Sequence, residues 1–189
     1  FDALGNLWVL DRARGGAVVW LWDGSTARKV ELRGVSGQQV RSFSVSGEGS
    51  RLAVGMAGAD PKVIVVNLLR DSEGVFLASG RSQAIRFGQA DLVSGRLLDL
   101  GWRSSDTLAL LWRDGQRSRV SYVSSDGSPA NSLRVVSSPY FGAAPSLVVS
   151  PDSALPLALS NADGSLVSLE ESGSWAILTK DLSTPVYSR

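Results

Sequence analysis

A short motif returns four times along this chain at intervals of roughly fifty residues. Each copy joins a small or polar turn to a short apolar strand, and the copies span Gly5–Leu10, Ser50–Val54, Asp106–Leu110 and Ser153–Leu159. Repeats of ~40 to ~50 residues with several strands each are typical of β-propeller blades. The repeat therefore predicts an all-β propeller, and propellers serve more often as binding platforms than as catalysts.

The strand-like runs group into about four blades, each a four-stranded antiparallel meander with strands lettered a to d from the centre outward. The expected blades span residues 1–32, 40–78, 97–136 and 146–178, within one propeller domain over 1–189, and a closing segment covers 182–189. Their expected strands include Val40–Val45, Arg51–Gly55, Leu97–Trp102, Leu108–Trp112 and Ser132–Val136. The first blade has no strand a, so we expect a truncated or partial propeller with further blades upstream. Between strands c and d, Asp23-Gly24 predicts a type I′ hairpin.

The composition excludes several kinds of chemistry. Cys and His are both absent, which removes disulfides, thiol nucleophiles and His-based triads. A net charge of +1 gives no reason to expect nucleic acid as a partner. The nearest approach to a calcium loop, Asn161–Gly164, lacks the acidic ligand that should follow. We therefore predict that the chain is not an enzyme, with no catalytic residues, no cofactor and no metal.

The six tryptophans allow two interpretations. Aromatic faces stack on sugars, but Trp in a propeller more often packs one blade against the next. Trp20 and Trp22 lie two apart in one expected strand and so point to the same face. We expect blade packing for all six, namely Trp8, Trp20, Trp22, Trp102, Trp112 and Trp175.

The candidate partner-binding surface is the rim built by the loops between strands d and a and between strands b and c. Two loops stand out: the long Ser79–Arg96, and Ser137–Pro145 with its aromatic pair. Arginine beside exposed aromatics is the composition of interaction hot spots. The alternative is that the aromatic pair is buried. The candidate residues are Arg12, Arg14, Arg81, Arg86, Phe87, Arg113, Tyr140 and Phe141. Nearby acids are few (Asp60, Asp91, Asp114 and Asp163), so we expect a locally basic rim that favours an acidic protein surface or an anionic envelope polymer.

Three stretches carry a resemblance to a known family. They are Gly5–Asp11, Ser46–Val54 and Thr184–Tyr187. With them the chain resembles the C-terminal propeller domain of LpqB lipoproteins, which are actinobacterial. The resemblance implies an extracytoplasmic protein, held at the cell membrane by an N-terminal lipid that this chain does not include. It also implies a partner, the extracytoplasmic domain of an MtrB-like sensor kinase in a two-component system, and it carries no catalytic motif.

The function predicted from these observations is a non-catalytic, protein-binding and regulatory propeller of a membrane-anchored lipoprotein. Two alternatives stay open. One is a secreted carbohydrate-binding or lyase-type propeller, which would use tryptophans and carboxylates. The other is a TolB-like scaffold in an envelope complex. Glycan-induced changes in tryptophan fluorescence would favour the first over both protein-binding readings.

Overall fold

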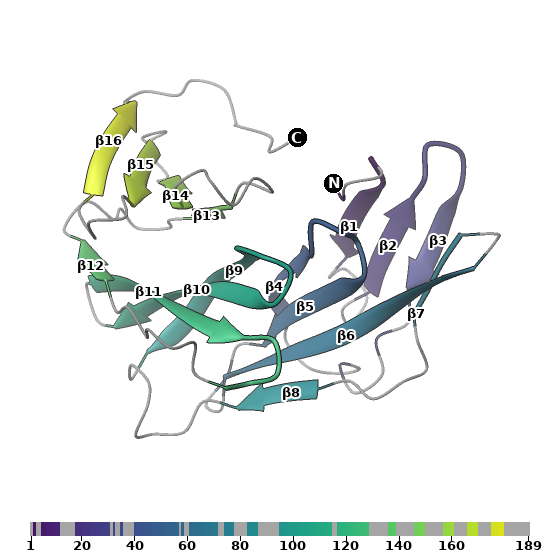
Figure 1. Ribbon diagram of the computed structural model, residues 1–189, viewed down its shortest axis with the longest axis horizontal. Helices are drawn as coiled ribbons and strands as arrows, with labels where there is room; N and C mark the ends of the chain where they lie inside the picture. Colours follow the sequence, from purple (N-terminus) through teal and green to yellow (C-terminus); the bar gives the residue numbers. More distant parts are fainter. Residues whose placement is uncertain are drawn as a thin grey trace.

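The computed structural model describes residues 2, 5–11, 18–30, 32, 35, 40–56, 58, 61–71, 74–77, 83–86, 95–114, 117–128, 136–138, 146–149, 157–160, 166–169 and 175–179. Within these residues every regular element is a β-strand, and none is a helix that could cross a membrane. The strands form four antiparallel sheets that follow one another around an arc (Figure 1). The sheets do not close into a ring. The all-β propeller fold is therefore confirmed.

The first two sheets come from the N-terminal half of the chain. The first sheet has three strands in the order β1-β2-β3: β1 (Leu7–Asp11), β2 (Val18–Trp22) and β3 (Ala27–Val30). The second has the order β4-β5-β6-β7: β4 (Val40–Val45), β5 (Arg51–Met56), β6 (Lys62–Asp71) and β7 (Gly74–Leu77). The strand β4 begins and ends where the sequence predicts it. Within the described residues, the first sheet has no strand that corresponds to strand a.

The other two sheets are four-stranded meanders. The third consists of β9 (Arg96–Trp102), β10 (Thr107–Asp114), β11 (Arg117–Ser124) and β12 (Val136–Ser138). The fourth consists of β13 (Ser146–Val148), β14 (Leu157–Ser160), β15 (Leu166–Leu169) and β16 (Trp175–Thr179). The strand expected at Ser132–Val136 falls largely outside the described residues, and β12 begins only at Val136.

One strand lies where the sequence predicts a loop. Within the segment Ser79–Arg96, residues Gln83–Arg86 form β8, which pairs with the first half of β6. The second half of β6 pairs with β7 instead. Strand β6 is ten residues long, so it can carry two short partners end to end. The interpretation of this whole segment as a loop was therefore wrong.

The turn that precedes strand b is closed in the same way in the first three sheets. A side-chain oxygen before the turn accepts the backbone N–H that begins, or lies next to, strand b. Asp2 Oδ1 accepts from Asn6 at 3.0 Å, Ser46 Oγ from Arg51 at 3.0 Å, and Ser104 Oγ from Thr107 at 3.2 Å. Short polar side chains satisfy turn N–H groups in this manner, which explains why a polar residue precedes each apolar strand in the repeat.

The core lies between neighbouring sheets, because each interior strand is apolar on both of its faces. Leu52 and Val54 of β5 face the first sheet, while Ala53 between them faces the third. In β10, Leu108 and Leu110 face the second sheet, and Ala109 faces the fourth. Strand b therefore presents large side chains to the preceding blade and a small one to the following blade.

The five tryptophans whose side chains the structure describes divide into two groups, and the side chain of Trp175 lies outside that description. Trp8, Trp102 and Trp112 are buried, and their indole N–H groups donate to Asp2 Oδ2, the Ser44 carbonyl and Ser121 Oγ. Trp20 and Trp22 share one face of β2, as predicted, but both are exposed. The expected packing of these two against another blade is not met among the described residues, where no sheet covers that face.

Candidate functional site

The blade topology defines two rims. Because the strands of a blade alternate in direction, the a–b and c–d turns lie at one end of the sheets and the b–c and d–a connections at the other. We name these ends the a–b rim and the b–c rim. The b–c rim is the one that the sequence indicates as the partner-binding surface.

Basic residues predominate at the strand ends of the b–c rim. We consider the first or last two residues of each described strand at this rim. The basic residues there are Lys29, Arg41, Lys62, Arg86, Arg96, Arg113 and Arg117, and the acidic residues are Asp11 and Asp114. Strand pairing brings several of these together: Lys62 lies opposite Arg86, Arg113 opposite Arg96, and Asp114 opposite Arg117. Strand pairing thus brings most of these basic residues to the same end of the second and third sheets.

Only two of the predicted contact residues fall among the described ones. Arg86 is the last residue of β8, and Arg113 is half-buried near the end of β10. Both belong to the b–c rim, in neighbouring blades. The others lie outside the described residues, namely Arg12, Arg14, Arg81, Phe87, Tyr140 and Phe141. The same holds for Asp60, Asp91 and Asp163 and for the calcium-like stretch Asn161–Gly164.

Sequence reasoning missed Lys62, Arg96 and Arg117 as members of this rim. Lys62 and Arg117 lie just outside the loops that the prediction considered, and Arg96 ends the expected loop Ser79–Arg96 but begins β9 in the structure. The signal was available, because each is a basic residue at the first position of a strand that follows a b–c or d–a connection.

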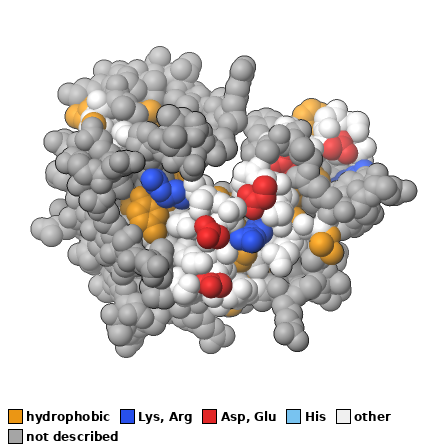
Figure 2. Space-filling model, viewed as in Figure 1, with side chains coloured by type: hydrophobic (Ala, Val, Ile, Leu, Met, Phe, Trp, Pro, Cys, Tyr) orange, Lys and Arg blue, Asp and Glu red, His pale blue; other side chains and the backbone are white. Residues whose placement is uncertain are grey.

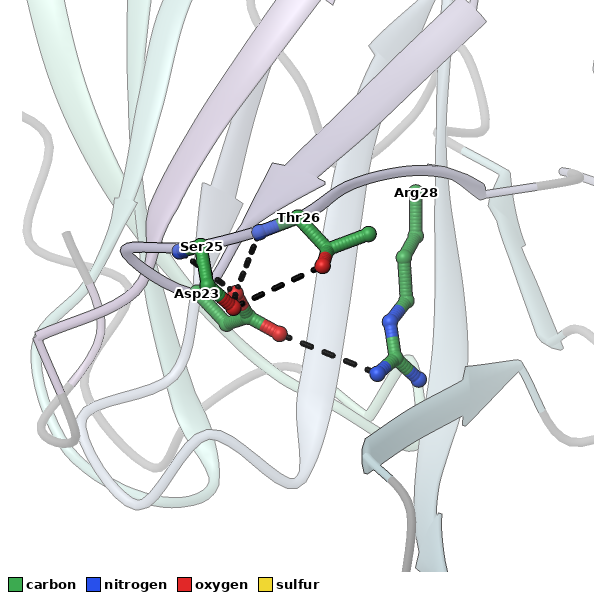
Figure 3. Close-up of polar contacts among 4 residues, drawn as sticks. All are labelled: Asp23, Ser25, Thr26 and Arg28. Carbon is green, nitrogen blue, oxygen red and sulfur yellow. Dashed lines mark hydrogen bonds and ion pairs between the residues drawn. The ribbon is translucent and has the colours of Figure 1, made fainter.

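The a–b rim carries charges of both signs, and its carboxylates are held by their own turns. Asp23 follows β2, and its Oδ1 accepts from Ser25 N at 2.9 Å, Ser25 Oγ at 2.8 Å and Thr26 N at 2.8 Å (Figure 3). Arg28 Nη2 lies 3.7 Å from Asp23 Oδ2. The hydrogen bonds from Thr26 and Ser25, with a smaller contribution from Arg28, lower the pKa of Asp23 to about 2.

This turn differs from the predicted type I′ hairpin. Trp22 pairs with Ala27, so the connection has four residues, Asp23 to Thr26, rather than two. Gly24 does adopt a positive φ of 97°, as an Asp-Gly turn requires. The Asp23 carboxylate closes the turn by accepting the N–H groups of Ser25 and Thr26, which a two-residue hairpin would not offer.

Arg51 joins the second and third blades on the same rim. Its Nη1 donates to the Ser105 carbonyl at 2.7 Å and to Ser125 Oγ at 3.2 Å. Close by, side-chain bonds from Ser104 and Thr107 lower the pKa of Asp106, and Arg51 lowers it further. In Figure 2 acidic side chains gather beside basic ones near the middle of the face shown. Arg51 and Asp106 are thus both engaged in polar contacts within the protein, which is typical of residues with a structural role in turns.

A half-buried carboxylate connects the third and fourth blades. Asp99 of β9 accepts from Leu147 N of β13 at 2.9 Å through Oδ2, and from Leu100 N at 2.9 Å through Oδ1. Burial raises the pKa of Asp99, and these two N–H groups together with Arg41 offset part of that increase. Arg41 Nε itself donates to the Leu98 carbonyl at 3.3 Å. Asp99 is thus engaged in holding the inner strands together.

The described residues offer little for catalysis or metal binding. Among them no three acidic side chains gather in a way that could hold a metal ion. Two carboxylates with shifted pKa values, Asp23 and Asp99, accept hydrogen bonds from neighbouring groups of the protein. The arrangement is suited to presenting charge on a rigid rim.

Four antiparallel sheets laid side by side around an arc, with their connections gathered on two rims, place this chain in the β-propeller class. The chain belongs to the family described as the lipoprotein LpqB beta-propeller domain, whose family model matches residues 1–188. The resemblance inferred from the sequence motifs is therefore confirmed. A search of curated proteins gave no match.

Proposed function

We propose that this chain is a non-catalytic, extracytoplasmic protein-binding propeller of a membrane-anchored lipoprotein. Its role is to bind and regulate the extracytoplasmic domain of a sensor kinase in a two-component system. Membership in the lipoprotein LpqB propeller family supports the lipoprotein setting. Extracytoplasmic attachment through an N-terminal lipid follows from that setting.

The observation that carries the proposal is the basic b–c rim. Most of the basic residues on this rim are arginines. The planar guanidinium group of arginine pairs bidentately with carboxylates, which favours recognition of an acidic protein surface. The rim also extends over two neighbouring blades, since Arg86 lies in the second sheet and Arg96 and Arg113 in the third. A contact that spans several blades suits the surface of a folded partner domain better than a single peptide strand.

Calorimetric titration with the sensor's extracytoplasmic domain tests the proposal. Replacing Arg81, Arg86 and Tyr140 with Ala should weaken binding by tenfold or more, because arginine and tyrosine are the residues most often found as interaction hot spots. The melting temperature should change little, because substitutions away from the core usually alter stability by no more than ~0.5 kcal/mol. The matched control replaces Glu48, Asp106 and Asp126 on the a–b rim with Ala, and it should bind as the parent does. A triple variant that binds as tightly as the parent would refute the proposal.

The carbohydrate-binding alternative has one observation in its favour, the exposure of Trp20 and Trp22. Indole faces on an open sheet are suited to stacking on sugars. The positions of these residues within the repeat support a different role, which follows.

A further inference from the structure

The first sheet presents a bare apolar face. Val9 of β1 is 43% exposed, and Trp20 and Trp22 of β2 are 36% and 44% exposed. Val9 pairs with Trp20, and Leu7 pairs with Trp22, so these side chains form two adjacent rows on one face of the sheet. Large exposed apolar side chains that gather in one place mark a surface that another molecule or segment covers.

The same positions are buried in the next two blades. Aligned on the repeat, Leu7 and Val9 correspond to Leu52 and Val54 in the second sheet, which are 0% exposed. Their strand partners Val66 and Ile64 correspond to Trp22 and Trp20, and they are 5% and 4% exposed.

The third sheet repeats this pattern. Leu108 and Leu110 occupy the corresponding positions of β10 and are 0% exposed, and their partners Val123 and Ser121 are also buried. In both sheets the blade that precedes in the chain covers these positions. The bare face of the first sheet is therefore the face that, elsewhere in this protein, receives a preceding blade.

The edge of the first sheet repeats the same relationship. Strands β5, β10 and β14 each pair on one side with an inner strand, namely β4, β9 and β13. Strand β1 corresponds to them in the repeat, yet its only neighbour among the described strands is β2. The unpaired edge of β1 needs an inner strand as its hydrogen-bonding partner, and the apolar face beside that edge needs a covering sheet.

We propose that this surface is the seat of one further blade of the same repeat, which lies on Val9, Trp20 and Trp22 and supplies the inner strand beside β1. The occupant presents a small side chain at the middle of its strand b, as Ala53 and Ala109 do toward the blades that follow them. Large side chains of one sheet then fill the space above small ones of the next, as at the interfaces within this chain.

A chimera tests this inference. A second copy of residues 40–101 is fused ahead of Phe1. This copy supplies the second sheet followed by strand β9, in the order in which they precede β10 in the parent chain. The copied β9 should pair with β1, and the copied sheet should cover the two indoles. Acrylamide quenching of Trp20 and Trp22 should fall several-fold from the parent value. Their contribution is obtained by difference from the same proteins carrying Trp20→Phe and Trp22→Phe.

Matched controls decide between the possible occupants. Ala53→Arg in the appended copy places a long charged side chain on the contacting face and should restore quenching, while the same change at a solvent-facing position, Asn67→Arg, should not. Indoles that stay as accessible in the chimera as in the parent would overturn the proposal. So would a parent that forms dimers which dissociate on Trp22→Asp, because that result assigns the face to a second copy. Protection of the parent's indoles by insoluble cell-wall glycan would assign it to a sugar.

Discussion

Arg51 Nη1 donates a hydrogen bond of 2.7 Å to the backbone carbonyl of Ser105, across the boundary between the second and third blades. Arg51 is the first residue of β5, directly after the polar turn of the repeat. The backbone N–H of Arg51 donates to Ser46 Oγ and so closes the turn within its own blade. Its side chain contacts the corresponding turn of the next blade. The turn motif therefore holds neighbouring blades together as well as starting a strand.

Replacing Arg51 with Ala should lower the free energy of unfolding by about 1 kcal/mol, since two partly exposed hydrogen bonds across the blade boundary are lost. Urea denaturation followed by tryptophan fluorescence measures the change. The matched control is Arg28→Ala, which removes an exposed ion pair and should cost less than about 0.5 kcal/mol. Equal effects of the two substitutions would show that Arg51 does not hold the boundary.

Gly101 of β9 lies against the fourth sheet with no room for a side chain. A Cβ there would stand 2.5 Å from Val149 Cγ2 and 3.2 Å from Val149 Cβ. Gly101→Ala should therefore destabilise the fold by about 1 to 3 kcal/mol through overpacking. Val149→Ala in the same chain should recover part of the loss. A single variant as stable as the parent in thermal melts would contradict this close packing.

The buried carboxylate Asp99 should give stability an unusual pH dependence. Its folded-state pKa is raised above the unfolded value, so the folded protein takes up the proton first as the pH falls. Asp99 therefore costs stability at neutral pH, and this cost is relieved as the pH falls through the raised pKa. In urea titrations at pH 7 and pH 4, the parent should gain stability relative to Asp99→Asn on acidification. A loss, or parallel curves, would contradict the assignment.

Asp23 should behave in the opposite way. Its pKa is lowered to about 2 in the folded state, so its contribution is present at neutral pH and is lost as the pH falls from the ordinary pKa of 3.8 toward 2. The parent should lose stability relative to Asp23→Asn over that interval, by a small amount because the group is exposed. Differential scanning calorimetry at pH 4 and pH 2.5 measures the difference, and no change would show that the Ser25 and Thr26 bonds do not favour the ionised form.

The repeat predicted most of the fold because its turn-plus-strand unit is a local signal. β4 appears at the predicted bounds, and β5, β9 and β10 lie within two residues of theirs. β8 escaped prediction because Gln83–Arg86 is too short and polar to stand out, and it becomes a strand only by pairing with β6. The exposure of Trp20 and Trp22 was not predicted. Burial of these side chains depends on whether a neighbouring blade covers them, and the local sequence pattern carries no information on that.

The candidate site was predictable only in its general character. An excess of arginine in the connecting loops indicated a basic rim, and Arg86 and Arg113 do lie at its strand ends. The contribution of Lys62, Arg96 and Arg117 depends on which strand ends meet across blades. Strand direction and register determine this, and they emerge only when the sheets are assembled.

The central claim is that the b–c rim contacts a sensor's extracytoplasmic domain. Hydrogen–deuterium exchange of the chain, alone and saturated with that domain, tests it most directly. We expect binding at the b–c rim to slow exchange in peptides covering 57–61, 79–96 and 137–145, which include its b–c and d–a connections. The a–b turns at 23–26, 46–50 and 103–106 should exchange at unchanged rates. Protection confined to the a–b turns, or no protection at saturation, would contradict the account.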